Sequence, residues 1–266
     1  MTQRVTCPLG TTQEYLVLRF KGITDVGQKR DDNEDRFVVN EDRQYAILAD
    51  GMGGRMYGEV ASTMAVEFLS RCIENERPKH LARLDRNEQG AMLTNLMDEW
   101  VRGVNGAIYQ KGQQDERYRD MGTTLVAIVG FGPQALLVHV GDSRAYSWHE
   151  GVLKQITEDH SFVNSQVKQG MMTEQEARES NQRNIITRAV GTADRVKPDI
   201  TIHTLRKGER LILCSDGLSD MIDDAAISAI MGQEGDLEAS AEALVDAANE
   251  AGGKDNITVI LAELAS

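Results

Sequence analysis

The chain has no cysteine pair at a spacing typical of a disulfide framework or a zinc site. Its three cysteines, Cys7, Cys72 and Cys214, are odd in number and far apart. This excludes a disulfide-stapled fold and a CxxC zinc module, and it fits a reducing compartment. No apolar run reaches the ~18 residues of a membrane span, and the first residues contain no hydrophobic segment of a signal peptide. We therefore expect a cytoplasmic protein that does not span a membrane.

Positive charge is also scarce. The chain has 29 Lys and Arg against 42 Asp and Glu, which gives a formal net charge of −13. Such a surface repels nucleic acid and anionic lipid, so both are poor candidate partners. The excess of acidic residues either serves solubility or reflects carboxylates that gather around a cation.

Several nucleotide and hydrolase motifs are missing as well. There is no GxxxxGK[ST] and no GxSxG, and the glycine loop after Asp50 has Met56 where a dinucleotide-binding loop needs its third glycine. No cysteine is followed by the arginine of a Cys-nucleophile phosphatase loop. An EF-hand-like start at Asp85 has Leu96 at its twelfth position instead of Glu. The five histidines show no metal-ligand spacing.

What remains is a globular pattern without linker or repeat, in which 41% of the 266 residues are hydrophobic. Short runs rich in Val, Ile and Leu predict strands at Tyr45–Ala49, Thr123–Val129, Ala135–Val140, Arg210–Cys214 and Ile257–Leu261. Apolar residues at helical spacing predict helices over 58–76 and 91–110, and a third over Leu237–Glu250. Two helices in succession followed by several strands predict an α+β domain, with antiparallel sheet and helices packed outside.

The segment Gln155–Val196 is polar and poor in strands. Thr173 followed by Glu176 is a capping-box pattern that predicts a short helix there. Long irregular segments of compact domains are usually functional loops or poorly ordered. We favour a flap beside a substrate cleft over a mere insertion.

Acidic residues stand at the ends of the predicted strands. Asp50, Asp142 and Asp216 each follow an apolar run, while Glu34–Asp35 and Asp255 precede one. A single Asp-Gly strand end is an ordinary turn signal, but so many in one chain suggest carboxylates that converge on one cleft.

Converging carboxylates without accompanying His or Cys suit Mg²⁺ or Mn²⁺, and two such ions are the usual equipment for phosphoester hydrolysis. Gly51 has no side chain, so its carbonyl could approach an ion closely. Arg30 could bind a phosphate through two parallel hydrogen bonds, or it could pair at the surface with Asp31 or Asp32.

Eight motifs in order give the chain a resemblance to a known family. They are RDDNED (30–35), ADGMGG (49–54), MGTTLV (121–126), VGDSRAY (140–146), TEDHS (157–161), ITRAVG (186–191), LCSDGL (213–218) and KDNITV (254–259). The set resembles the type 2C, or PPM, metal-dependent protein serine/threonine phosphatases in their bacterial form. Each motif is weak alone, but the ordered set spans the chain from about residue 20 to its end.

The resemblance implies a single-domain, four-layer αββα fold, in which a sandwich of two antiparallel sheets is flanked by helices on both sides. Residues 1–19 would be an N-terminal extension, 20–266 the phosphatase domain and about 159–190 its flap. The resemblance also implies two Mn²⁺ or Mg²⁺ ions and a third, weaker one.

The resemblance further implies roles for individual residues. Asp50 would bridge two ions, the Gly51 carbonyl would bind one of them, and Asp216 and Asp255 the other. Glu34 and Asp35 would act nearby through bound waters. Asp142 would help hold the third ion, Arg144 would support it, and Arg30 would clamp the substrate phosphate.

The expected mechanism is direct attack on phosphorus by a metal-bridging water, without a phosphoenzyme. The leaving oxygen then needs a proton. Animal members of the family carry histidine where this chain has Met52, which cannot donate. A metal-bound water or another group must supply the proton, and His160 is one candidate.

The leading hypothesis is thus a monomeric phosphatase that acts on phosphoserine and phosphothreonine proteins and opposes a bacterial Ser/Thr kinase in signalling. A regulatory pseudophosphatase that kept only the fold is the alternative. A phosphatase for small phosphoesters, or an antagonist of anti-sigma factors, is a third possibility. Acidic residues at every expected metal position favour an active enzyme.

Overall fold

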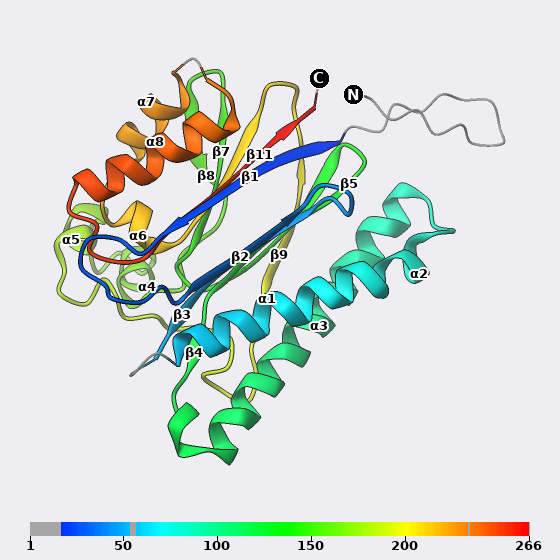
Figure 1. Ribbon diagram of the computed structural model, residues 1–266, viewed down its shortest axis with the longest axis horizontal. Coiled ribbons are helices and arrows are strands. Elements are labelled where there is room, and N and C mark those ends of the chain that lie inside the picture. The colour runs from blue at the N-terminus through cyan, green and yellow to red at the C-terminus, as the bar shows by residue number, and fades with distance from the viewer. Residues whose placement is uncertain (1–16, 54–56, 234, 266) are drawn as a thin grey trace.

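The computed structural model describes residues 17–53, 57–233 and 235–265. Its strands form two antiparallel sheets, and Figure 1 shows them stacked face to face. In spatial order, one sheet contains β1 (Leu18–Asp25), β11 (Ile257–Leu264), β10 (Arg210–Cys214), β7 (Arg144–His149) and β8 (Val152–Gln155). The other contains β2 (Asp35–Asn40), β3 (Tyr45–Met52), β5 (Leu125–Phe131), β6 (Gln134–Val140) and β9 (Asp199–Thr204), with β4 (Gly122–Thr123) paired to the end of β3.

Helices cover the outer face of each sheet. On the β2–β9 sheet lie α1 (Gly58–Asn75) and α3 (Arg86–Gln114), with the short α2 (Arg77–Leu81) between them in the chain; a 3-10 turn, η2 (Glu116–Tyr118), follows α3. On the β1–β8 sheet lie α6 (Asp216–Ser219), α7 (Asp224–Met231) and α8 (Leu237–Glu250). The remaining helices, α4 (Phe162–Lys168) and α5 (Glu174–Glu179), lie in the predicted flap.

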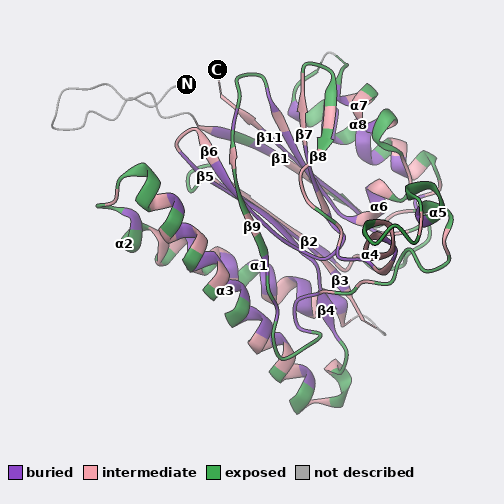
Figure 2. Ribbon diagram, turned by 180° about the vertical axis from the view of Figure 1, so that it is seen from behind, coloured by how far each residue is buried: buried purple, intermediate pink, exposed green. Residues whose placement is uncertain are grey.

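Three hydrophobic clusters lie between these layers and pack them together. One joins α1 and α3 to β3, β5 and β6 and includes Trp100. A second fills the space between the sheets and includes Leu48 and Leu213. The third joins α7 and α8 to β10 and β11 and includes Tyr146. Figure 2 shows this buried material along the sheets and on the inward faces of the helices. The predicted four-layer αββα fold is confirmed.

Strand alternation explains why two clusters meet at one sheet. In β3, Ile47 contacts the helical side and Leu48 the sheet-to-sheet side, because successive side chains point to opposite faces. Both faces are therefore covered, and β3 reads as a continuous apolar run that ends at Asp50. The fold thus delivers a carboxylate from the rigid centre of the sandwich.

The EF-hand-like start at Asp85 is the N-terminus of α3. The Asp85 carboxylate accepts a hydrogen bond from the Glu88 amide at 2.9 Å, and the Glu88 carboxylate accepts one from the Asp85 amide at 2.9 Å. This capping box satisfies two amides of the first turn and extends the helix beyond its predicted start. The predicted capping box at Thr173 and Glu176 likewise begins α5.

The predicted N-terminal extension, residues 1–19, lies outside the described residues except for its last three. Leu18 and Arg19 begin β1, which pairs with β11. Cys7 and Gly54 also lie outside the described residues. Within the described part, no helix has both the length and the apolar character needed to cross a membrane.

Candidate metal centre

Asp35 and Asp50 face each other across the β2–β3 pair. The Asp35 side chain is 1% exposed, and its Oδ2 accepts a 2.6 Å hydrogen bond from the Thr258 hydroxyl on β11. Its Oδ1 is buried and has no hydrogen-bond partner among the described residues. A buried carboxylate oxygen without a partner is costly unless a cation or water binds it.

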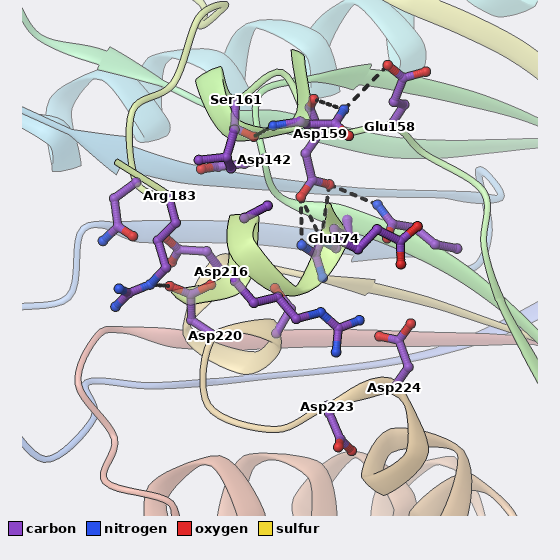
Figure 3. Close-up of a pocket in the computed structure, with 18 of the residues that line it drawn as sticks. Asp142, Glu158, Asp159, Ser161, Glu174, Arg183, Asp216, Asp220, Asp223 and Asp224 are labelled. Atoms are coloured by element: carbon purple, nitrogen blue, oxygen red, sulfur yellow. Dashed lines mark hydrogen bonds and ion pairs between the residues drawn. The ribbon is translucent and has the colours of Figure 1, made fainter. Parts of the chain in front are cut away.

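Two further aspartates come from turns between layers. Asp216 begins α6 directly after β10, and Asp142 lies in the turn that connects β6 to β7. Asp142 is 8% exposed, and its Oδ1 also has no hydrogen-bond partner in the described part of the chain. Figure 3 shows both carboxylates at the wall of one pocket.

The carboxylates are close enough to repel one another. Burial, followed by the charges of Asp35, Asp216, Asp142 and Asp255, raises the pKa of Asp50 well above its usual value. Burial and the same kind of repulsion raise the pKa of Asp216 in the same way. Burial raises the pKa of Asp35 to about 7 and, together with the charge of Asp159, that of Asp142 to about 7. A divalent cation would relieve these repulsions.

The start of α1 leaves room beside the Gly51 carbonyl. A Cβ on Gly58 would lie 2.7 Å from Gly51 O and 2.8 Å from Glu34 Oε2, distances at which something would have to shift. A Cβ on Gly51 would in turn lie 2.3 Å from Gly58 O. Two glycines therefore let β3, α1 and the Glu34 side chain meet closely. Burial raises the pKa of Glu34, although Arg30 opposes this.

Arg30 binds Asp255 rather than either acidic neighbour in the sequence. Its Nη2 lies 2.7 Å from Asp255 Oδ2, and both side chains are partly exposed. This hydrogen bond raises the pKa of Arg30. The local alternative, a pairing with Asp31 or Asp32, is not what the structure shows. Arg30 and the predicted ligand Asp255 thus lie together at the rim of the site.

Hydroxyl and amide side chains that we did not predict hold the backbone of the acidic residues in place. The amide of Asp50 donates to Thr124 Oγ1 at 3.0 Å, and Thr123 Oγ1 donates to the Asp50 carbonyl at 2.9 Å. Asn256 accepts from the Glu34 amide at 2.8 Å and donates to the Asp32 carbonyl at 2.9 Å. The motifs that contain these residues, MGTTLV and KDNITV, were recognisable in the sequence. The contacts were not, because the residues that they bind are remote along the chain.

The flap and the β1–β8 sheet enclose a cleft of about 580 Å³ beside Asp142 and Asp216. Arg144 binds Asp159 through two nitrogens, at 3.0 and 2.6 Å, where the flap begins. Arg183 approaches Asp220 at 3.5 Å from the opposite side of the cleft (Figure 3). The flap is thus tied to the same wall that carries the carboxylates.

Two residues considered for proton donation have different places. Met52 ends β3, opposite Gly122 in β4. It therefore lies in the segment of residues 50–53 that carries Asp50 and Gly51, which we call the metal loop. His160 is 7% exposed and both its ring nitrogens are already bonded, Nδ1 to the Gly141 amide and Nε2 to Asp199. His160 therefore has no free ring nitrogen from which to protonate a leaving group.

The donor set fits hard divalent cations. It brings together carboxylates from β2, β3, α6 and the β6–β7 turn, two of them with unpartnered buried oxygens, and a carbonyl made accessible by Gly58. Oxygen donors of this kind suit Mg²⁺ and Mn²⁺. Among the described residues, the one group of three His, Cys, Asp or Glu side chains whose ligand atoms all lie within 4.8 Å of one another is His139, His160 and Asp199, behind the Asp142 turn. No three carboxylates of the centre approach one another that closely in the described part of the chain.

Comparison with known proteins agrees with this site. Residues 24–262 match the family described as protein phosphatase 2C. The protein phosphatase PhpP of Streptococcus pneumoniae is 40% identical over 249 residues, which cover 91% of this chain and 96% of that protein. The serine/threonine protein phosphatase PstP of Mycobacterium tuberculosis is 40% identical over 94% of this chain, which spans 45% of that longer protein.

Solved structures agree as well. The crystal structure of the Mycobacterium tuberculosis serine/threonine phosphatase PstP superposes with a TM-score of 0.84 at 38% identity, covering 94% of this chain and all of that one. The PstP catalytic domain in complex with two manganese ions superposes with a TM-score of 0.82 at 36% identity, again over 94% of this chain and all of that one. The chain therefore belongs to the bacterial branch of the protein phosphatase 2C family of metal-dependent serine/threonine phosphatases.

Proposed function

We propose that this chain hydrolyses phosphoserine and phosphothreonine in proteins, at a centre of two Mn²⁺ or Mg²⁺ ions. The observation that carries the proposal is the convergence of buried carboxylates whose pKa values are raised by burial and by one another's charges, with unpartnered oxygens on Asp35 and Asp142. A binding module that had lost catalysis would have no need to keep these carboxylates at a cost in stability.

The family resemblance supplies the proposed ligands. Asp50 would hold both ions, the Gly51 carbonyl one of them, and Asp216 and Asp255 the other. Glu34 and Asp35 would act through bound water, and Asp142 would help hold a third ion. The Thr258 hydrogen bond to Asp35 supports its indirect role, because it occupies one carboxylate oxygen and orients the other.

When bound, the ions would lower the pKa of a water molecule and offset the negative charge of the phosphoryl group. The chain itself supplies orientation. Arg30 is half-exposed at the rim, and its guanidinium can turn from Asp255 to the phosphate without breaking a buried contact. Asp35 and Asp50 are fixed by backbone pairing, so the reacting geometry depends on rigid strands.

We also propose where this activity operates. The substrates would be cytoplasmic phosphoproteins in a signalling pathway, with a bacterial Ser/Thr kinase as the opposing enzyme and the chain acting as a monomer. The domain would begin near residue 20, and the segment of about 159–190 would be the flap that selects substrates. The relatives' names and the ties of the flap to the cleft support these proposals.

A chelator experiment tests the function. The protein is stripped with EDTA, and hydrolysis of a phosphothreonine peptide is measured with and without added Mn²⁺. We expect turnover only with metal, and loss of that turnover in Asp50→Asn. Absence of metal-dependent turnover in the unsubstituted protein would favour the pseudophosphatase alternative. Unchanged turnover in Asp50→Asn would show that Asp50 does not hold the catalytic ions.

A further inference from the structure

The turn that carries Asp142 crosses from one sheet to the other. β6 ends at Val140, and β7 of the opposite sheet begins at Arg144. Gly141 has φ +113°, and a Cβ there would lie 2.7 Å from the Thr124 side chain. The turn is therefore sharp and packed, and the direction of the Asp142 carboxylate depends on how its neighbours are held.

Two buried histidines hold the two flanks of this turn. The Gly141 amide donates to His160 Nδ1 at 2.9 Å, and the His160 amide donates back to the Gly141 carbonyl at 2.8 Å. On the other flank, His139 Nε2 lies 2.9 Å from the Ser143 carbonyl. The two rings pack together with their centroids 4.7 Å apart. Asp142 is thus bracketed by one histidine contact on each side.

These partners fix the proton on each ring. A backbone amide can only donate, so His160 Nδ1 is unprotonated and its proton is on Nε2, which donates to Asp199 Oδ2 at 3.0 Å. A carbonyl can only accept, so His139 carries its proton on Nε2. Arg188 Nη1 lies 2.8 Å from Asp199 Oδ1 and 2.9 Å from His160 Nε2. Because the guanidinium and His160 Nε2 both carry protons, the Asp199 carboxylate is the acceptor that they share. Burial lowers the pKa of both histidines, to about 4 for His139.

The contacts of His160 with Gly141 and of His139 with Ser143 form a clamp on the Asp142 turn. This clamp is linked by hydrogen bonds to the flap and to the metal loop. The Thr187 amide donates to the His160 carbonyl at 2.7 Å, which joins the two ends of the flap at this histidine. Ser143 Oγ lies 2.6 Å from Thr124 Oγ1, which also accepts from the Asp50 amide. Hydrogen bonds therefore run from the flap through the Asp142 turn to Asp50.

We propose that His139 and His160 are positioning residues, a packed pair of neutral imidazoles that fixes the Asp142 turn and thereby sets cation affinity at Asp142. The inference rests on the proposed function, because it assigns Asp142 to a third ion. It does not involve Asp255, which pairs with Arg30 and does not line the cleft beside Asp142. Loosening either histidine contact frees the turn and weakens the ion at Asp142 more than the ions at Asp50.

The first test is NMR spectroscopy of metal-free protein labelled with ¹⁵N. Long-range ¹H–¹⁵N spectra report the tautomer of each imidazole, and hydrogen exchange reports the Gly141 amide. We expect the Nε2–H tautomer at both His139 and His160, and a Gly141 amide protected from exchange. An Nδ1–H tautomer at His160, or a rapidly exchanging Gly141 amide, would overturn the clamp without any reference to catalysis.

The second test compares variants. His160→Leu removes the acceptor for Gly141, whereas His160→Asn keeps an oxygen near the Nδ1 position. His203→Asn is the matched control, because His203 lies on β9 like Asp199 and binds a carboxylate, Glu209, away from the Asp142 turn. Mn²⁺ binding is followed by calorimetry, and the Mn²⁺ concentration for half-maximal turnover is measured in parallel.

We expect His160→Leu to weaken the weakest Mn²⁺ site about 10–100-fold, as removal of a residue behind a metal ligand usually does. His160→Asn should recover most of that loss, and His203→Asn should match the unsubstituted protein. An unchanged Mn²⁺ titration in His160→Leu, or equal losses in Leu and Asn variants that follow only their melting temperatures, would refute the proposal. Failure of the proposed function would instead appear as no turnover in the unsubstituted protein, with the NMR result unaffected.

Discussion

Asp35 illustrates how one side chain can serve both a sheet and a metal centre. It is a strand residue of β2, paired with Asp50, and it accepts a hydrogen bond from Thr258 of the other sheet. That bond lowers the pKa of Asp35, yet burial outweighs it and leaves the pKa at about 7. Burying the ionised Asp35 side chain therefore costs free energy, and a bound cation would offset that cost. A single side chain can in this way contribute to metal affinity.

The first residue-scale prediction concerns Asp50→Asn. The amide keeps the size of the carboxylate but removes the negative charge that would hold the ions, so we expect metal-dependent turnover to fall at least about 100-fold. The melting temperature in chelator should stay the same or rise, because a repulsive buried acid is gone. Turnover and differential scanning calorimetry measure the two effects. A parallel loss of stability in chelator would mean that Asp50 acts by supporting the fold.

The second residue-scale prediction concerns Arg30→Lys. Lysine keeps the charge beside Asp255 but cannot make two parallel hydrogen bonds to a phosphate. We expect KM for a phosphothreonine peptide to rise about tenfold, with little change in the Mn²⁺ concentration needed for activity. Steady-state kinetics at saturating Mn²⁺ test this. A change in metal requirement with unchanged KM would instead assign Arg30 to Asp255 alone.

At the scale of elements, the junction of β3 and α1 is a tightly packed part of the site. Gly51 and Gly58 approach so closely that a Cβ on either would collide with the other's backbone. The hydroxyls of Thr123 and Thr124, which lie at the end of β4 and just before β5, bind the Asp50 carbonyl and amide. The metal loop is therefore positioned by the backbone of α1 and by these two hydroxyls rather than by its own side chains.

A glycine substitution tests this junction. In Gly51→Ala the new Cβ would lie 2.3 Å from Gly58 O and 2.7 Å from Glu34 O, and backbone atoms cannot move aside like a flexible side chain. We expect a loss of about 3 kcal/mol in the free energy of unfolding, together with weaker Mn²⁺ binding. Gly106→Ala in α3 is the control, since a Cβ there meets nothing within 4 Å. Alanine should stabilise that helix by about 0.5–1 kcal/mol. Urea denaturation in chelator measures both values, and a neutral Gly51→Ala would contradict the close approach.

The elements most visible in the sequence were those with the strongest period. α8 has its predicted bounds, and β10 matches its predicted range, because continuous apolar runs or helical stripes mark them. β9 was not predicted, since its residues are mostly exposed or half-buried and its strand state comes from pairing with β6. β1 was missed for a related reason: its polar residues alternate irregularly and β11 supplies its partner. Pairing between distant segments cannot be read from local pattern.

The same contrast between local sequence signals and distant contacts holds for the site. Strand-end carboxylates such as Asp50 and Asp216 were predictable, because Asp-Gly after an apolar run is a local signal. The pairing of Arg30 with Asp255 was not, since 225 positions separate them. The role of His160 was also misjudged, because its partners Gly141 and Asp199 lie on other elements. Residue identity indicated the chemistry, whereas the tertiary contacts decided which groups are free to take part.

At the scale of the whole molecule, the net charge of −13 has a structural component. Part of the acidic excess is gathered in one buried site, which contains Asp35, Asp50, Asp142 and Asp216. Burial and the charges of neighbouring carboxylates raise the pKa of each of these side chains. The metal-free domain therefore carries a destabilising charge at its centre. Cations bind the native chain and not the unfolded one, so metal binding and folding are thermodynamically coupled.

This coupling predicts how the stability of the metal-free protein depends on pH. An aspartate of the unfolded chain has a pKa of about 3.9, whereas those of Asp35 and Asp142 in the folded chain are about 7. Their pKa is raised on folding, so their stabilising contribution is full below pH ~4 and is lost as the pH rises toward 7. Each such group changes the free energy of unfolding by about 1.4 kcal/mol per pH unit within that window.

We therefore expect the protein in EDTA to melt at a lower temperature at pH 7.5 than at pH 5.5. Added Mn²⁺ should raise the melting temperature more at pH 7.5, because ionised carboxylates bind the cation and protonated ones do not. Asp216→Asn should flatten the pH dependence in EDTA, since it removes one of the mutually repelling acids. Scanning calorimetry across this range decides the matter. A metal-free protein whose stability rises from pH 5.5 to 7.5 would show that its buried carboxylates do not repel one another as the structure implies.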